Sequence, residues 1–268
     1  MLHKKIELRE SGSFDAYATT YLIESNSEIK NRRRPVVIIC PGGAYMSISD
    51  REGEPIALRF LSEGYHAIVL HYSVYPNATY PTALLELGRV VSMLREKSDE
   101  WLIDKDKIIL MGFSAGGHLA ASYSCFWTKD FISRSLSCKR EELMPNALIL
   151  GYPVITSEHT LGGSFRHLLG DKYDELLEEM SLEKQVNADN PPTFMWHTVT
   201  DEAVSYKNSV LFEAALKEKG ISAQLHLYPE GMHGLALANE VTAADESQIV
   251  PSCQDWVIRA LCWLKNTH

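Results

Sequence analysis

One segment of the sequence has the spacing Gly-x-Ser-x-Gly, and it runs from Gly112 to Gly116 with Ser114 at its centre. An apolar run over Ile108 to Met111 precedes it, and a helical pattern over Gly117 to Cys125 follows it. A serine on a sharp turn between a strand and a helix is exposed, and small neighbours keep the two elements from colliding. The start of the helix also favours negative charge beside the hydroxyl. We therefore predict that Ser114 is a nucleophile for acyl transfer; the alternative is a serine in a glycine-rich loop.

A serine hydroxyl is a poor nucleophile at neutral pH, so this chemistry requires a general base, which is usually a histidine. His233 lies in the segment 230–234 (EGMHG), directly after an apolar run over Gln224 to Tyr228. The other histidines lie near the termini, before or beside Ser114, between residues 155 and 190, or inside predicted strands. Because a histidine on a glycine-flanked loop after a strand can reach over the serine, we predict that His233 is the base.

The base needs an acid that fixes its tautomer, and in this strand–turn–helix setting the order along the chain is serine, acid, histidine. Asp201 follows the predicted strand Thr193 to His197 by a short turn and fits that order. Glu202 is its nearest rival, and Asp171 and Asp174 lie in a region without predicted strands. A helix-capping role for Asp201 is the structural alternative, since a helix is predicted to begin near Ser205.

A glycine-rich turn, 41–45 (PGGAY), follows the predicted strand Val36 to Cys40. Acyl transfer builds negative charge on the carbonyl oxygen, which backbone N–H groups of such a turn can stabilise as an oxyanion hole. We predict that Gly43, Ala44 and Ala115 donate these N–H groups; a plain tight turn is the alternative. Tyr45 beside them is a candidate substrate-binding side chain, although an ordinary half-buried aromatic residue fits equally well.

Short apolar runs alternate with helical patterns along the chain, which predicts βαβ units and an α/β fold with a mostly parallel, doubly wound sheet and helices on both faces. The predicted strands are 36–40, 67–72, 108–111, 147–150, 193–197 and 224–228, with antiparallel edge strands at 6–9 and 18–23. Besides the helix after Ser114, helices are predicted over 54–63, 81–97, 205–219 and 251–265. We expect one domain over 1–268, in which 155–190 is a small lid insertion with a short acidic helix at 174–180.

The chain has a formal net charge of −9 and a pI of about 5.6, which argues against nucleic acid or a membrane surface as partner. No signal peptide and no run of 18 apolar residues is visible, and the five cysteines are scattered, which is typical of a cytoplasmic protein with reduced thiols. No motif for a metal, a nucleotide or another cofactor occurs, so we expect none. A homo-oligomer stays open.

Three blocks together resemble the acetyl esterase and acetylxylan-esterase-like branch of the α/β-hydrolases, whose cousins include kynurenine formamidase and the lipases related to hormone-sensitive lipase. The blocks are 36–75, 112–120 (GFSAGGHLA) and 228–238 (YPEGMHGLALA). The resemblance implies cofactor-free hydrolysis of small-molecule esters with short acyl groups, often acetyl groups on sugars, and it assigns Ser114, Asp201 and His233 to the catalytic triad. The sequence departs from the family at Ala44, where a third glycine is usual, and at Ser205, where proline is common.

Two other functions remain open at this stage. The same triad would serve an amide or formamide hydrolase of the kynurenine formamidase type, and a catalytically inactive binding protein could use the same fold. Two further groups of residues are predicted to be structural. His118 is predicted to be a packed, hydrogen-bonded histidine, and Asp50, Glu52 and Glu54 to form an acidic cluster at a helix N-terminus.

Overall fold

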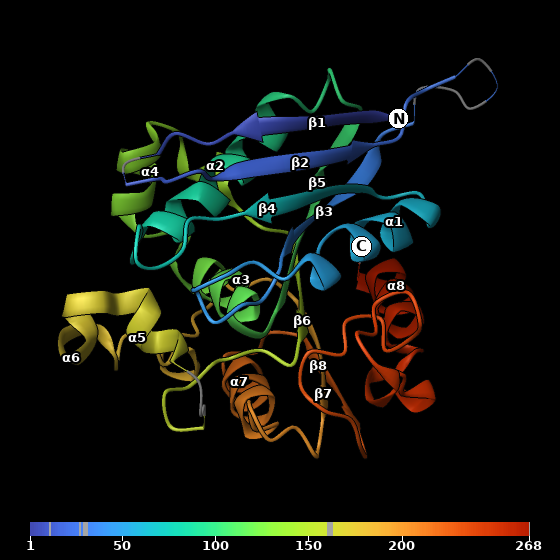
Figure 1. The fold of residues 1–268 in the computed structure, drawn as a ribbon. Coiled ribbons are helices and arrows are strands. Elements are labelled where there is room, and N and C mark those ends of the chain that lie inside the picture. The colour runs from blue at the N-terminus through green and yellow to red at the C-terminus, as the bar shows by residue number, and fades with distance from the viewer. Residues whose placement is uncertain (11, 27, 29–31, 160–162, 268) are drawn as a thin grey trace.

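A computed structural model describes residues 1–10, 12–26, 28, 32–159 and 163–267. Its centre is an eight-stranded sheet in the order β1-β2-β4-β3-β5-β6-β7-β8 (Figure 1). The strands are β1 Leu2–Glu7, β2 Tyr17–Leu22, β3 Arg34–Cys40, β4 His66–His71, β5 Ile103–Phe113, β6 Ala147–Gly151, β7 Thr193–Thr198 and β8 Ala223–Tyr228.

The six strands from β3 to β8 pair in parallel, whereas β2 is antiparallel to both β1 and β4. The predicted mostly parallel sheet is therefore confirmed. Of the two N-terminal strands, β1 forms the edge of the sheet, and β2 lies between β1 and β4. The central strands are buried because helices cover both of their faces, which is why their sequences are nearly continuous apolar runs.

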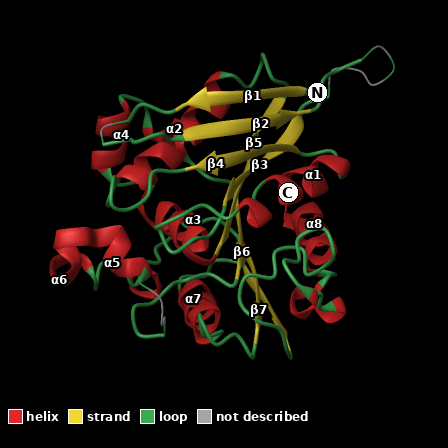
Figure 2. Cartoon of the chain, viewed as in Figure 1, coloured by secondary structure: helices red, strands yellow, loops and turns green. Residues whose placement is uncertain are grey.

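Helices pack on the two faces of the sheet, so that the strands form the middle layer (Figures 1 and 2). On one face, α1 and α8 share a buried apolar cluster in which Trp196 of β7 stacks on Trp256 with ring centroids 5.2 Å apart. On the other face, α2, α3, α4 and α7 share a second cluster. The helices are α1 Glu54–Ser62, α2 Thr82–Glu96, α3 Ser114–Phe126, α4 Asp130–Leu136, α7 Lys207–Glu218 and α8 Trp256–Thr267.

Several element boundaries differ from the predicted ones. The strand β5 begins at Ile103, five residues before the predicted start. Its first part was not predicted because the stretch 104–107 is charged and partly exposed, and therefore lacks an apolar pattern. The predicted helix 251–265 is divided into a 3-10 turn, Pro251–Cys253, and then α8. The helix α4 was not predicted from the sequence.

The segment 155–190 lies beside the carboxyl ends of the strands, and α5 and α6 project from the body of the protein there (Figure 1). Its described part holds α5 Ser164–Leu169, α6 Tyr173–Leu176 and 3-10 turns at Gly170–Lys172 and Leu182–Lys184, and no strand. The acidic helix predicted over 174–180 is thus the shorter α6. Residues 160–162 of this segment lie outside the described residues.

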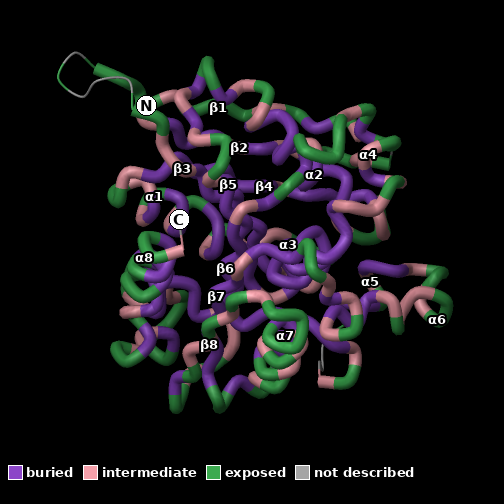
Figure 3. The backbone as a smooth tube through the Cα atoms, turned by 180° about the vertical axis from the view of Figure 1, so that it is seen from behind, coloured by how far each residue is buried: buried purple, intermediate pink, exposed green. Residues whose placement is uncertain are grey.

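Most buried residues lie in the sheet and in α3, whereas residues of α6 and of the outer face of α7 are exposed or partly exposed (Figure 3). Ser114 and Asp201 therefore lie on or directly after deeply packed elements, whereas His233 follows the more exposed strand β8. None of the helices in the described part of the chain is both long enough and apolar enough to span a membrane.

Candidate active site

Ser114 lies at the junction of β5 and α3 and has a left-handed backbone conformation with φ +52°. Non-glycine residues rarely adopt this conformation, and it persists only where the surroundings enforce it. A Cβ atom at Gly112 would lie 2.2 Å from Gly116 O, and one at Gly116 would lie 2.1 Å from Cys40 O. Only glycine fits at both places, so the predicted requirement for small neighbours has a direct steric cause.

His233 bridges Ser114 and Asp201. Its Nε2 atom is 2.8 Å from Ser114 Oγ, and its Nδ1 atom is 2.7 Å from Asp201 Oδ2. Because Nδ1 faces a carboxylate, it carries the proton, and Nε2 is left to accept a hydrogen bond from the serine hydroxyl. The structure thus brings together three predicted residues that are far apart in the sequence.

Asp201 is buried and uses its two oxygens for different tasks. Oδ1 accepts the N–H groups of Ala203 at 3.0 Å and Val204 at 2.9 Å, while Oδ2 faces His233. Burial alone would raise the pKa of Asp201, but hydrogen bonds from His197 and His233 lower it well below its ordinary value. The carboxylate therefore stays ionised beside the imidazole.

Asp201 does not cap a helix, and Glu202 and Asp174, two of the rival acids, do not take its place. The helix α7 begins at Lys207, so Asp201 caps the tight turn before that helix and not the helix itself. Glu202 is exposed, and α6 carries Asp174 away from the sheet edge.

The turn after β3 has an unusual backbone conformation. Gly43, Ala44 and Tyr45 have φ values of +134°, +55° and +57°. Among the described residues, none accepts a hydrogen bond from the N–H of Gly43 or Ala44. Ala115 is the second residue of α3, where a helix has no internal acceptor for its N–H. These three predicted donors are thus available at the carboxyl edge of the sheet.

Tyr45, the candidate substrate-binding side chain, is only 3% exposed. Its hydroxyl donates to His118 Nδ1 at 2.9 Å, and His118 Nε2 donates to Met180 O at 2.9 Å. The prediction that His118 is a packed, hydrogen-bonded histidine is confirmed. The side chain of Tyr45 packs in the apolar cluster, and its hydrogen bond to His118 connects the turn to α3.

Three residues near the site were not recognised from the sequence. His197 contacts Asp201, Glu52 contacts the backbone of Gly42, and His167 Nδ1 lies 2.9 Å from Ala44 O. A histidine inside an apolar strand, four residues before the candidate acid, is the one sequence signal that could have identified His197. The predicted acidic cluster does stand at helix starts, with Asp50 and Glu52 in a 3-10 turn and Glu54 at the start of α1, but the side chain of Glu52 is buried and turns inward.

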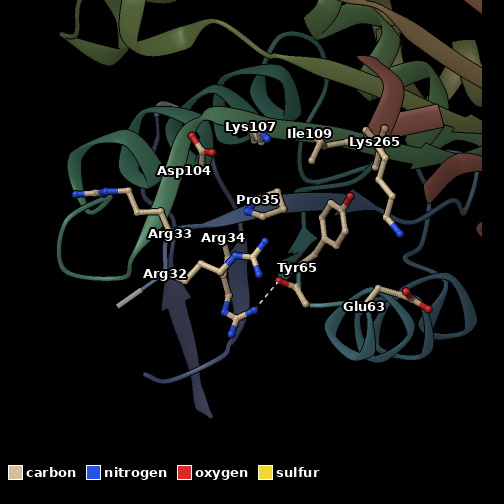
Figure 4. A pocket seen from close by; sticks show the side chains of 12 residues that line it. Arg32, Arg33, Arg34, Pro35, Glu63, Tyr65, Asp104, Lys107, Ile109 and Lys265 are labelled. Carbon is tan, nitrogen blue, oxygen red and sulfur yellow. Dashed lines mark hydrogen bonds between the residues drawn. The ribbon is translucent and has the colours of Figure 1, made fainter. Parts of the chain in front are cut away.

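A cavity of about 480 Å³ opens at the opposite edge of the sheet, where β3 and β5 begin (Figure 4). Charged side chains line much of it, namely Arg32, Arg33, Arg34, Lys107, Lys265, Glu63 and Asp104. Two of these arginines hold the main chain, since Arg33 donates to Ser98 O and Arg34 to Gly64 O. Because Ser114 follows the carboxyl end of β5, this cavity is separate from the candidate active site.

No group of three or more His, Cys, Asp or Glu side chains in the described part of the chain is arranged to hold a metal ion. The arrangement around Ser114 contains a hydroxyl, an imidazole, a carboxylate and backbone N–H groups, which is the set of groups that nucleophilic acyl transfer uses.

A family model and several curated proteins match this chain in sequence. A family model described as BD-FAE matches residues 23–216. Endo-1,4-beta-xylanase B of Butyrivibrio fibrisolvens is 36% identical over 220 residues, which are 80% of this chain and 34% of that protein. The chain spans about half the length of two further curated relatives.

Solved structures match over nearly the whole chain. The carboxylesterase Cest-2923 from Lactobacillus plantarum has a TM-score of 0.87 and 29% identity, with 99% of this chain and 98% of that chain covered. An acetyl ester-xyloside bifunctional hydrolase from Caldicellulosiruptor lactoaceticus has a TM-score of 0.80 and 32% identity, with 94% of this chain and 88% of that chain covered. The fold is that of an α/β hydrolase.

Proposed function

Since the chain belongs to the BD-FAE family of α/β hydrolases, we propose that it is a carboxylic ester hydrolase with Ser114 as its nucleophile. The observation that carries the proposal is the continuous hydrogen-bond chain from Ser114 Oγ through His233 to Asp201, with distances of 2.8 and 2.7 Å. Relatives and structural neighbours that are named esterases and carboxylesterases support the same reaction class.

In the proposed mechanism, His233 Nε2 takes the proton of Ser114 as Oγ attacks the ester carbonyl. Asp201 holds the imidazole in the reactive tautomer and stabilises the imidazolium that forms. The N–H groups of Gly43, Ala44 and Ala115 stabilise the oxyanion. His233 then protonates the leaving alcohol, and a water molecule activated by the same imidazole releases the acid from the acyl-enzyme.

We further propose that the substrates carry short acyl groups, acetyl groups on sugars in particular. Two similar proteins support this class, one named an acetylxylan esterase and one an acetyl ester-xyloside bifunctional hydrolase. The proposal is tested by comparing kcat/KM for p-nitrophenyl acetate, acetylated xylo-oligosaccharides and N-formylkynurenine. Preferred turnover of the formamide would replace it with the amide hydrolase alternative.

The segment 155–190 is proposed to form one wall of this site. His167 of α5 contacts Ala44 O, the carbonyl of a proposed oxyanion donor, and Met180 O accepts from His118 behind the same turn. The insertion therefore contacts the turn directly through His167 and indirectly through His118, which suits a substrate-covering role. Replacement of His167 by alanine should raise KM for acetylated oligosaccharides more than for p-nitrophenyl acetate, and equal changes in both would contradict the proposal.

Ser114→Ala tests the whole proposal. It should lower kcat by about four to six orders of magnitude while leaving the protein folded. Ser133→Ala in α4 is a matched control and should keep wild-type kcat. A fluorophosphonate probe should label the wild type and not Ser114→Ala. Retained activity in Ser114→Ala would overturn the assignment of Ser114 as the nucleophile. No labelling and no turnover by the wild type would favour a binding protein.

A further inference from the structure

Glu52 is a buried acid directly behind the proposed oxyanion hole. It ends the 3-10 turn Asp50–Glu52 and is only 4% exposed. Its two carboxylate oxygens accept from different parts of the chain: Gly42 N–H donates to Oε2 at 2.7 Å, and Tyr152 O–H donates to Oε1 at 2.7 Å. A buried carboxylate is costly unless hydrogen bonds satisfy it, and both oxygens here are satisfied.

Tyr152 extends this contact to the loop that carries His233. Its hydroxyl accepts the N–H of Ala236 at 2.9 Å, and its ring lies edge-on to the His233 ring with centroids 5.0 Å apart. Burial, together with the nearby Glu52, raises the pKa of Tyr152 well above its ordinary value, so the hydroxyl keeps the proton that it donates. Glu52 therefore connects the turn after β3 to the loop after β8.

The carboxylate also lies close to the nucleophile. A Cβ atom built on Gly42 would be 2.8 Å from Glu52 Oε2 and 2.9 Å from Ser114 Cβ. The space between the acid and the serine is thus too narrow for a single methyl group. A small displacement of Glu52 or Gly42 would be transmitted directly to the reacting groups.

The neighbouring Arg51 holds the same loop at other points. Its Nη2 atom donates to Gly234 O at 2.7 Å, and its Nε atom donates to Thr242 O at 2.5 Å. Arg51 and Glu52, which are consecutive residues of one short turn, therefore make contacts to the turn after β3 and to the loop after β8.

We propose that Glu52 is a positioning residue that holds the oxyanion turn 42–45 and the His233 loop in the mutual arrangement that acyl transfer requires. The inference rests on the proposed function. The turn needs contacts from outside to keep its shape, because two consecutive non-glycine residues, Ala44 and Tyr45, have positive φ values, which is a strained arrangement. Since the oxyanion forms only along the reaction, loss of this hold should lower kcat and leave KM nearly unchanged.

Two substitutions at Glu52 separate positioning from packing. Glu52→Ala removes both hydrogen bonds and should lower kcat for p-nitrophenyl acetate about a hundredfold, as the loss of an oxyanion donor does. Glu52→Gln keeps one carbonyl acceptor for Gly42 N–H, so its kcat should be about tenfold higher than that of Glu52→Ala. Tyr152→Phe removes only the link to the His233 loop and should also lower kcat. Glu54→Gln, on an exposed side chain two residues away, is the control and should keep wild-type kcat.

Folding of each variant is checked by urea unfolding, and Ser114→Ala is measured in parallel. Wild-type kcat in folded Glu52→Ala, or a rise in KM with unchanged kcat, would overturn the positioning role. If Glu52→Ala does not fold, Glu52→Gln and Tyr152→Phe decide, and wild-type kcat in both would overturn it. Activity in Ser114→Ala would instead refute the proposed function, so the two failures are distinguishable.

Discussion

His197 lies four residues before Asp201, and its Nε2 atom is 3.3 Å from the Asp201 Oδ2 atom that also faces His233. The side chains of His197 and Asp201 are both fully buried. His197 is itself held at both ring nitrogens: Nε2 donates to Val204 O at 2.8 Å, and Nδ1 accepts from Ser209 Oγ at 2.8 Å. The acid of the proposed triad is therefore fixed by the core of β7 and α7.

His197→Gln should lower kcat by about tenfold, because a glutamine cannot keep the contacts of both ring nitrogens, and Asp201 then becomes less well oriented. Ser209→Ala removes one of these contacts and should have a smaller effect. Steady-state kinetics with p-nitrophenyl acetate measures both. His226→Gln, on the more exposed strand β8, is the control. Equal kcat in His197→Gln and wild type, with both folded by near-UV circular dichroism, would contradict this role.

Asp201→Asn should lower kcat by about four orders of magnitude, because the amide can donate to Nδ1 and so stabilise the wrong imidazole tautomer. Burial of the side chain prevents solvent from replacing the lost acceptor. Glu202→Gln changes the exposed neighbour in the same way and should leave kcat near that of the wild type. The two variants together identify the acid, and a large loss in Glu202→Gln with little in Asp201→Asn would reverse the assignment.

The fold and the main site residues could be predicted because their signals are local. The motif around Ser114 needs only a strand before it and a helix after it, and both patterns are strong. His233 and Asp201 follow from the positions of their loops after successive strands, since the carboxyl ends of parallel strands meet at one edge of the sheet. The helices α4 and α5 were missed because seven and six residues are too short for a clear helical periodicity.

The contacts behind the site could not be predicted, because they depend on the direction of single side chains. Glu52 lies among acidic residues before a helix, and this pattern is typical of an exposed helix start. The side chain of Glu52 nevertheless points inward and accepts a hydrogen bond from Gly42 N–H. His167 and Ala44 are distant in the sequence, and no periodicity relates them. Such pairs are specified by tertiary packing.

Gly43→Ala should abolish most activity, because a Cβ atom there would lie 2.0 Å from Ser47 O on a backbone with φ +134°. The turn must rearrange, and loss of an oxyanion donor lowers kcat about a hundredfold or more. Gly220→Ala is a matched control: φ is +75°, and no atom lies within 4 Å of the new Cβ. It should cost about 1 kcal/mol of stability and leave kcat unchanged. Comparable activity of both alanine variants would show that the turn 42–45 has no part in catalysis.

His118 should make the protein less stable in mild acid. Burial lowers its pKa from 6.5 to about 4. Below pH 6.5 the unfolded chain takes up a proton at this residue, and the folded chain does not until the pH reaches about 4. Because the unfolded state then binds more protons, the free energy of unfolding falls as the pH falls through this window, by roughly 3 kcal/mol over its full width.

His118→Gln removes this titration, so its free energy of unfolding should fall less steeply between pH 7 and pH 4.5 than that of the wild type. The difference between the two proteins should shrink by about 2 kcal/mol over that range, as measured by urea unfolding. Tyr45→Phe is the decisive control, because it removes the hydroxyl that bonds His118 Nδ1 but keeps the buried imidazole. It should lower stability at every pH and keep the wild-type slope. Equal slopes in His118→Gln and wild type would mean that the folded protein takes up this proton over the same pH range as the unfolded chain, against the burial that the contacts of His118 with Tyr45 and Met180 describe.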